Sequence, residues 1–287
     1  MLSFGDFLAD LMNPALGFLP KALIVAMLSA IVCAVVGTHV VLRSMAFIGD
    51  AVAHAVFPGI AIAFALQGSV LLGGAVAGAV VALLVATFSQ RRRIKEDTLI
   101  GIFFAAAFAV GLVVISRIDG YTASLTSFLF GSLTGVSNSQ VYAVAGVGFV
   151  VVSLLIILQR PLSAVALDRE SAQAMNLPVF FLDIVLYLAV TAAVVISIST
   201  IGNILVLALL VTPAATARML SDRLSIMMVL SALIGAAASF IGLYFSWALD
   251  IPTGATIVLT VTVFFLAAWL FAPRHGLLLR RKVAANA

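Results

Sequence analysis

Two side chains that can bind a metal ion stand four residues apart in an apolar stretch of the sequence. They are Asp50 and His54, in the segment SMAFIGDAVAHAVFPGIAIAF. Because an α-helix brings residues four apart onto one face, these side chains would lie next to each other. Manganese favours oxygen ligands, zinc favours nitrogen, and both accept a mixture, so the pair indicates half of a transition-metal site. The same spacing also fits an Asp and a His that neutralise each other in a buried polar contact.

Pro58 adds to the metal interpretation. Proline has no N–H, and its ring clashes with the carbonyl group four residues earlier, which belongs to His54. That oxygen would be left free beside the candidate ligands. Counted from Arg43 at the expected membrane boundary, Asp50 would lie ~10 Å and His54 ~16 Å into a bilayer, near its midplane. A charge inside a membrane costs ~2.5–3.5 kcal/mol, so we expect this one to have a function.

The elements that must position these residues are membrane-spanning helices. Of the 287 residues, 64% are apolar and 9% are charged, and the mean hydropathy is +1.29. Roughly 18 or more apolar residues in a helix cross ~30 Å of hydrocarbon, and backbone groups in lipid must be satisfied within the segment. The sequence therefore predicts an all-α, polytopic transmembrane bundle of about nine helices, with eight or ten as alternatives. The predicted spans are 18–42, 46–66, 69–89, 98–116, 139–159, 181–199, 203–219, 226–248 and 254–272.

The basic residues predict how the bundle is oriented. Short loops that carry Lys and Arg stay on the cytoplasmic side of a membrane. Of the 15 basic residues, 13 fall at one set of helix ends, and only Lys21 and Arg117 fall at the other. The N-terminus is therefore predicted outside and the C-terminus in the cytoplasm. The net charge of +4 is spread among short loops, so it does not indicate a protein that binds nucleic acid.

The chain is expected to form one transmembrane domain over residues 1–287. Residues 1–17 lack the basic start and cleavage site of a secretory signal and are predicted to lie at the membrane interface. Residues 120–138 are apolar, too short to cross and rich in Ser, Thr and Gly, which favours a re-entrant or half-membrane element. Gly74 and Gly78 form a small-xxx-small pair, which predicts close packing of the third span.

Four further residues are expected to have structural roles. Cys33 lies in apolar surroundings and is predicted to be a small buried packing residue. His39 is expected to be a packing or interfacial histidine. Asp183 is expected to cap or anchor the cytoplasmic end of the sixth span, and His275 to be solvated in the basic tail.

Four segments resemble, over nearly the full chain, the permease subunits of ABC importers for manganese, zinc and iron. They are VLRSMAFIGDAVAHAVFPGIAIAF (41–64), DTLIGIFFAAAFAVGLVVIS (97–116), IGNILVLALLVTPAATARML (201–220) and IPTGATIVL (251–259). In that family the D-x-x-x-H pair of the second span is implicated in the ion pathway, and the resemblance carries this role onto Asp50 and His54. The sequence contains no Walker phosphate loop, so ATP hydrolysis is expected in a separate subunit and no enzymatic activity is expected in this chain.

Within residues 160–180, a second segment resembles the cytoplasmic element that docks onto the ATPase subunit in the same family. Its sequence DRESAQAMNLPV (168–179) follows the family pattern of Glu, small residues and Gly before a short apolar turn. The resemblance assigns docking to Arg169, Glu170, Ala172, Ala174 and Asn176. Asn176 stands where glycine is usual, and because asparagine tolerates the left-handed backbone conformation, we expect the turn to be kept. An ordinary amphipathic loop helix is the alternative.

The resemblance implies a multi-pass permease in a bacterial cytoplasmic membrane that imports manganese or zinc. Its implied partners are a second copy of itself, two ATPase subunits that use ATP, an extracytoplasmic metal-binding protein and membrane lipid. No permanently bound cofactor is implied, since the metal is the cargo. A permease for iron or an iron or haem-like chelate is the related alternative. A proton-coupled secondary metal transporter and an intramembrane enzyme with Asp50 and His54 as an acid–base pair are the alternatives from other classes.

Overall fold

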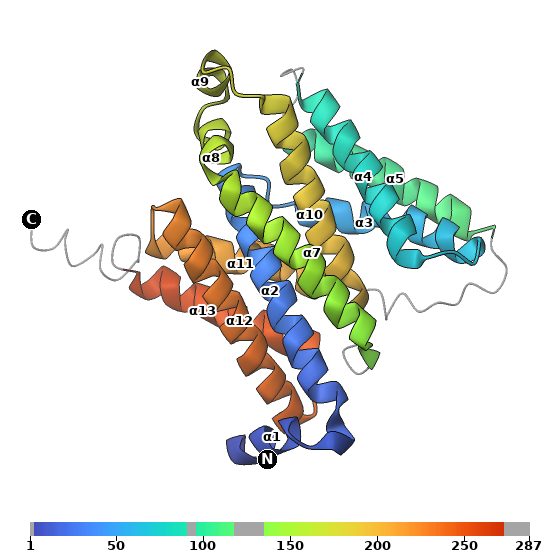
Figure 1. The fold of residues 1–287 in the computed structure, drawn as a ribbon, viewed down its shortest axis with the longest axis vertical. Helices are drawn as coiled ribbons and strands as arrows, with labels where there is room; N and C mark the ends of the chain where they lie inside the picture. Colours follow the sequence, from blue (N-terminus) through green and yellow to red (C-terminus); the bar gives the residue numbers. More distant parts are fainter. Residues whose placement is uncertain (1–2, 91–95, 118–134, 273–287) are drawn as a thin grey trace, which may run out of the picture.

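The computed structural model describes residues 3–90, 96–117 and 135–272, and every regular element within these ranges is a helix (Figure 1). The helices are α1 (Phe4–Leu11), the short 3-10 helix η1 (Pro14–Leu16), α2 (Phe18–Leu42), α3 (Ile48–Ala65), α4 (Val70–Ser89), α5 (Glu96–Ile115), α7 (Asn138–Ile157), α8 (Gln159–Leu167), α9 (Arg169–Ala174), α10 (Val179–Ile201), α11 (Asn203–Leu220), α12 (Leu224–Leu249) and α13 (Thr253–Phe271). The predicted all-α class is confirmed.

The predicted number of membrane spans is also confirmed for the described ranges. Nine of their helices are long and apolar enough to cross a membrane, namely α2, α3, α4, α5, α7, α10, α11, α12 and α13. Their ends lie within two residues of the predicted ones. This agreement follows from composition, because each apolar run is bounded by polar residues or by glycine and proline.

Local chemistry sets several of these ends. The Ser69 hydroxyl accepts a hydrogen bond from the Leu72 N–H at 3.4 Å at the start of α4. Ser137 and Gln140 form a reciprocal capping box at the start of α7. Gly202, with φ of 81°, ends α10 and redirects the chain into α11, which explains why the short run after it forms a separate span.

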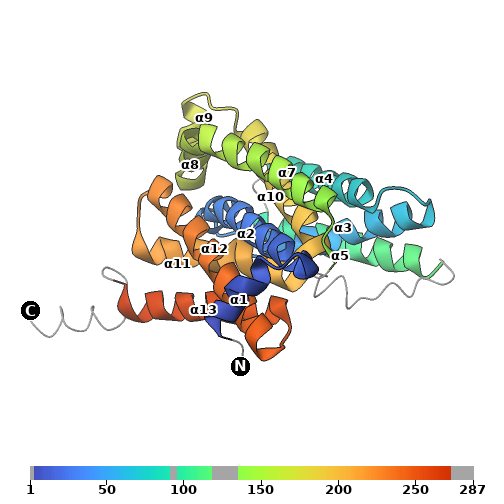
Figure 2. The ribbon, with the colours of Figure 1, turned by 60° about the horizontal axis from the view of Figure 1, so that its bottom comes forward.

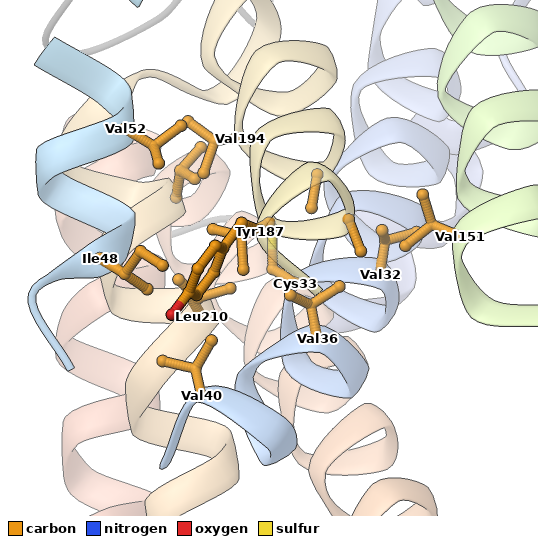
Figure 3. Packing of buried hydrophobic residues seen from close by; sticks show 14 of the residues in the cluster. Val32, Cys33, Val36, Val40, Ile48, Val52, Val151, Tyr187, Val194 and Leu210 are labelled. Atoms are coloured by element: carbon orange, nitrogen blue, oxygen red, sulfur yellow. The ribbon is translucent and has the colours of Figure 1, made fainter. Parts of the chain in front are cut away.

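Helices α2 and α10 form the interior of the bundle. Val36 of α2, Tyr187 of α10, Ile48 of α3 and Leu210 of α11 belong to one buried cluster (Figure 3). Helices α7 and α13 lie at outer faces, with α2 between them (Figure 2), and few of their residues are buried. Such apolar outer faces suit lipid, which agrees with the composition of the chain.

The small-residue pair of the third span packs as expected. A Cβ added to Gly74 would lie 2.8 Å from Val56 Cγ1 of α3, and one added to Gly78 would lie 2.6 Å from Thr191 Cγ2 of α10. Helix α4 is therefore held against both neighbours at distances that only glycine allows. The prediction of close packing is confirmed.

The two ends of the bundle are chemically different. At one end α1 packs on α12, with the rings of Phe4 and Tyr244 5.5 Å apart and the Trp247 indole N–H donating to Asp10 at 3.1 Å. At the opposite end lie the C-terminal end of α2 and helices α8 and α9 (Figure 1). Which end faces the cytoplasm stays a prediction, as does the interfacial position of residues 1–17. Most of the predicted element at 120–138 falls outside the described residues.

Candidate functional site

A sharp turn between α2 and α3 decides where the candidate metal ligands lie. Ser44 in this turn has the left-handed φ of 56°, and α3 begins at Ile48. The predicted depths of Asp50 and His54 were counted as a helical rise from Arg43, but α3 begins five residues later, so that count is wrong. Counted from the first residue of α3, Asp50 lies only ~3 Å and His54 ~9 Å along the helix axis. The predicted depths of ~10 Å and ~16 Å are therefore too large as distances along α3.

Asp50 and His54 contact each other on one face of α3. The Nδ1 atom of His54 lies 2.9 Å from the backbone carbonyl oxygen of Asp50 and 3.4 Å from its carboxylate Oδ1. Because a carbonyl oxygen only accepts hydrogen bonds, Nδ1 carries the proton in this contact. In the neutral ring, Nε2 then carries the lone pair, and no hydrogen bond to it is found among the described residues. The side chains remain 24% exposed for His54 and 36% for Asp50, so both are accessible to an ion.

Two phenylalanines of α5 form a wall against the imidazole. The ring centroids of Phe104 and Phe108 lie 5.1 Å and 5.4 Å from that of His54, and both rings meet it edge to face. Phe57 of α3 continues the wall, with its ring 6.0 Å from Phe108. An apolar wall limits water and fixes the orientation of the ring, which are the usual tasks of the surroundings of a metal ligand. Sequence reasoning missed the contacts of His54 with Phe104 and Phe108 because these two rings belong to another helix.

Pro58 lies inside α3, one turn beyond His54, as expected. It supplies no N–H to the His54 carbonyl, which is thus available as a further oxygen donor beside the pair. Gly111 of α5 packs here: a Cβ added to it would lie 3.2 Å from the Pro58 nitrogen. The close approach of α5 to α3 therefore depends on a glycine opposite the proline.

One chain offers an ion only a partial ligand set. The described residues contain no group of three or more His, Cys, Asp or Glu side chains placed to share a metal. A groove of about 670 Å³ between α3, α4 and α5 is lined only by apolar side chains and glycine, so it provides no ligands either. Among the described residues, Asp50 and His54 therefore form a two-residue candidate site, with the His54 carbonyl beside it.

The segment predicted to dock onto an ATPase forms a short helix with a closed end. Helix α9 is followed by Asn176 with φ of 57°, so the left-handed turn expected there is present. The N–H of Asn176 donates to Gln173 O at 2.9 Å and that of Leu177 donates to Ala172 O at 3.1 Å. These two bonds make up a Schellman motif, which is usually built with glycine.

The five predicted docking residues do not share one surface. Glu170, Ala174 and Asn176 are exposed, whereas Ala172 is completely buried. Arg169 directs its guanidinium into the bundle, where it pairs with Glu96 and Asp183. Two large apolar side chains that sequence reasoning did not single out, Leu167 and Met175, are exposed beside the predicted residues.

Asp183 anchors α10 through a buried group of side chains. This Asp183 cluster consists of Arg43, Gln90, Glu96, Arg169 and Asp183. The anchoring role was expected. The direct partners of Asp183 come from α9, 14 residues earlier, and from the ends of α2 and α4, which are 140 and 93 residues away. The charge of Asp183 within an apolar span was the only signal that could have revealed them.

The other polar residues of the spans have structural surroundings. Cys33 is fully buried, with its Sγ 3.7 Å from the Ser197 hydroxyl, as expected for a packing residue. His39 is buried inside α2, and its Nε2 has no partner among the described residues. His275 lies outside the described residues.

Comparison with known proteins places the chain in a family. The model of the ABC 3 transport family matches residues 15–272. The "Manganese transport system membrane protein MntC" of Halalkalibacterium halodurans is 39% identical over 92% of this chain and 90% of its own. The "Probable iron transport system membrane protein" of Haemophilus influenzae is 34% identical over 94% of this chain and 95% of its own. The solved structure "PsaBC from Streptococcus pneumoniae in complex with Fab" contains a chain with 33% identity and a TM-score of 0.84, covering 99% of this chain and 100% of that one. This chain belongs to the ABC 3 transport family.

Proposed function

We propose that this permease imports manganese across a bacterial cytoplasmic membrane. The chain is a multi-pass membrane permease subunit of the ABC type. The proposal of manganese is supported by the mixed oxygen and nitrogen donors of Asp50 and His54 and by relatives named as manganese permeases. The observation that carries it is the His54 imidazole, which lies beside the Asp50 carboxylate and against a phenylalanine wall, with no hydrogen bond to its Nε2 among the described residues.

The partial ligand set supports assembly with a second copy. Manganese commonly takes about six ligands, whereas one chain presents one carboxylate and one imidazole at this place. Two copies that meet at this face of α3 would supply two of each, and water would complete the shell. Such a shared site binds an ion and can release it when the copies move apart.

ATP would act through separate subunits. We propose that α8 and α9 dock onto an ATPase, with Glu170, Ala174 and Asn176 in contact and Leu167 and Met175 as apolar anchors. The sequence contains no Walker phosphate loop, so hydrolysis belongs to that partner. An extracytoplasmic metal-binding protein would deliver the ion at the opposite end, where α1 and the loop before α13 lie.

A transport assay in vesicles tests this function. The permease and the ATPase that copurifies with it are reconstituted, and uptake of manganese, zinc and ferrous iron is measured with and without ATP. We expect ATP-dependent uptake that is fastest for manganese, and a loss of at least about tenfold in Asp50→Asn and in His54→Ala. Arg218→Gln, which alters an exposed side chain, is the control. Uptake driven by a proton gradient without the ATPase would refute the proposal.

Iron import is the second candidate. The relative in Haemophilus influenzae is named as a probable iron transport protein, and the one in Yersinia pestis as a chelated iron transport protein. A carboxylate and an imidazole also suit ferrous iron. Faster uptake of ferrous iron than of manganese in the same vesicles would favour this candidate.

A further inference from the structure

The carboxylate of Asp183 is the centre of the Asp183 cluster. Its side chain is fully buried, and both of its oxygens accept hydrogen bonds. Arg43 Nη1 donates to Oδ1 at 2.7 Å, and Arg169 Nη2 donates to Oδ2 at 2.5 Å. Gln90 Nε2 adds a bond to Oδ2 at 3.2 Å. The ends of α2 and α4 and the start of α9 therefore meet on one residue of α10.

Arg169 joins two helices with one guanidinium group. Its Nη1 donates to Glu96 Oε1 at 2.9 Å while its Nη2 donates to Asp183. Glu96 is the first residue of α5, and Asp183 lies in the second turn of α10. A planar guanidinium can hold two carboxylates in a fixed relation, which a lysine ammonium cannot do equally well.

Of the three ion pairs of the cluster, Arg43–Asp183 and Arg169–Glu96 differ most in their contact with solvent, and Arg169–Asp183 joins them. The side chains of Arg43 and Asp183 are 5% and 0% exposed, whereas those of Arg169 and Glu96 are 18% and 25% exposed. A buried pair is costly to separate, because each charge would stay in a medium of low dielectric constant. A partly solvated pair can exchange partners with water. The first pair is thus a fixed anchor, and the second is the part that can shift.

Helix α5 extends from this cluster to the candidate metal site. Phe104 and Phe108, which form the wall against His54, lie eight and twelve residues after Glu96 on the same helix. A helix transmits a displacement along its axis because its backbone hydrogen bonds keep it stiff. A shift of Glu96 would therefore move the wall relative to α3.

We propose that Arg169 is a positioning residue that transmits movement of α9 to α5. The proposal rests on the proposed function, in which an ATPase moves α9. Arg169 then pulls on Glu96, with Asp183 held in place by Arg43 as the pivot, and α5 shifts along α3 beside Asp50 and His54. Arg169 acts behind the docking surface, and its contacts lie inside the bundle.

The test measures metal ions transported per ATP hydrolysed, in vesicles that contain the permease and its copurifying ATPase. Arg169→Gln and Glu96→Gln should each lower this ratio at least about tenfold, while ATPase copurification and the basal rate of hydrolysis remain. Because both act on one contact, the double variant should do no worse than the poorer single one. Arg169→Lys keeps the positive charge but not the planar guanidinium that binds two carboxylates, so it should give an intermediate ratio. Arg218→Gln is the matched control, since Arg218 pairs with Asp222 at 3.6 Å and both are about half exposed.

Each outcome separates this inference from the proposed function. ATP-dependent manganese uptake by the wild type with an unchanged ratio in Arg169→Gln and Arg169→Lys would overturn the inference alone. Loss of ATPase copurification in Arg169→Gln would also overturn it, because Arg169 would then belong to the docking surface. No ATP-dependent uptake of any metal by the wild type would overturn the proposed function and this inference with it. Gel filtration and thermal unfolding of each variant identify those that fail to fold, and for these the lysine variant gives the deciding ratio.

Discussion

Gly59 of α3 and Gly73 of α4 face each other with their backbones in contact. A Cβ added to Gly59 would lie 2.1 Å from the Gly73 carbonyl oxygen, and one added to Gly73 would lie 2.3 Å from the Gly59 oxygen. Both separations are far below van der Waals contact, so a side chain on either residue forces the helices apart. Gly59 comes one residue after Pro58 and five after His54. This crossing therefore controls the position of α3 beside the candidate metal site.

Gly73→Ala should destabilise the protein and reduce uptake together. Overpacking at such a contact costs about 1–3 kcal/mol, because one helix must move away from the other. Thermal unfolding in detergent measures the first effect, and the vesicle assay measures the second. Gly146→Ala in α7 is the control, since its added Cβ would meet no atom within 4 Å. Equal stability of the two variants would contradict this account of the crossing.

Asp183→Asn should lower the free energy of unfolding far more than the same change at an exposed aspartate. It leaves Arg43 and Arg169 partly or fully buried without their shared carboxylate, and the loss of one partner of a buried pair costs about 3–5 kcal/mol. Asp222→Asn, which removes an exposed partner of Arg218, should cost no more than about 1 kcal/mol. Chemical denaturation of both variants checks the difference. Similar losses of unfolding free energy in the two variants would mean that the Asp183 cluster is solvated.

Asn176 should tolerate glycine but not a β-branched residue. Its φ of 57° lies in the left-handed region, where a branched side chain costs about 1–2 kcal/mol and glycine costs nothing. We expect Asn176→Val to lower the free energy of unfolding by about that amount and to weaken ATPase copurification, while Asn176→Gly leaves both unchanged. Gln173→Val, in the regular part of α9, is the control and should cost less than about 0.7 kcal/mol. If Asn176→Val leaves both the free energy of unfolding and ATPase copurification unchanged, the turn is free to rearrange.

The helices could be predicted because their signals are local. Apolar runs bounded by residues such as Ser69 and Gly202 report membrane spans directly, and the ends of all nine spans were placed within two residues. The break after α2 was predicted between 42 and 46, but its left-handed turn was not, because Arg43 to Phe47 carries no glycine or proline and Ser44 takes up the positive φ instead.

The candidate site was predictable only within one helix. The relation between Asp50 and His54 follows from their spacing, and so does the effect of Pro58 on the His54 carbonyl. The contact of Phe104 with His54 and that of Arg43 with Asp183 depend on how helices pack, and the latter joins residues 140 positions apart. Amphipathic patterning does not reveal such pairs in this chain, because its spans are apolar on all sides.

The orientation of the His54 ring predicts which of its two nitrogens would bind the metal ion. Nδ1 is hydrogen-bonded to the Asp50 carbonyl at 2.9 Å, so Nε2 is the nitrogen that remains available to an ion. The side-chain amide of glutamine reaches approximately the place of Nε2, and the shorter one of asparagine reaches that of Nδ1. His54→Gln should therefore keep part of the manganese uptake, whereas His54→Asn should raise the KM for manganese about tenfold further.

Uptake measured over a range of manganese concentrations distinguishes the two variants, and ATPase copurification confirms that both are assembled. Phe88→Leu is a suitable control, because Phe88 packs on Phe103 of the same α5 helix, with ring centroids 5.2 Å apart, without touching His54. It should leave the KM unchanged. If His54→Asn instead keeps more uptake than His54→Gln, the metal meets Nδ1, and the ring must release the Asp50 carbonyl when the ion binds. Equal, near-normal uptake by both variants would leave His54 as a structural partner of Asp50.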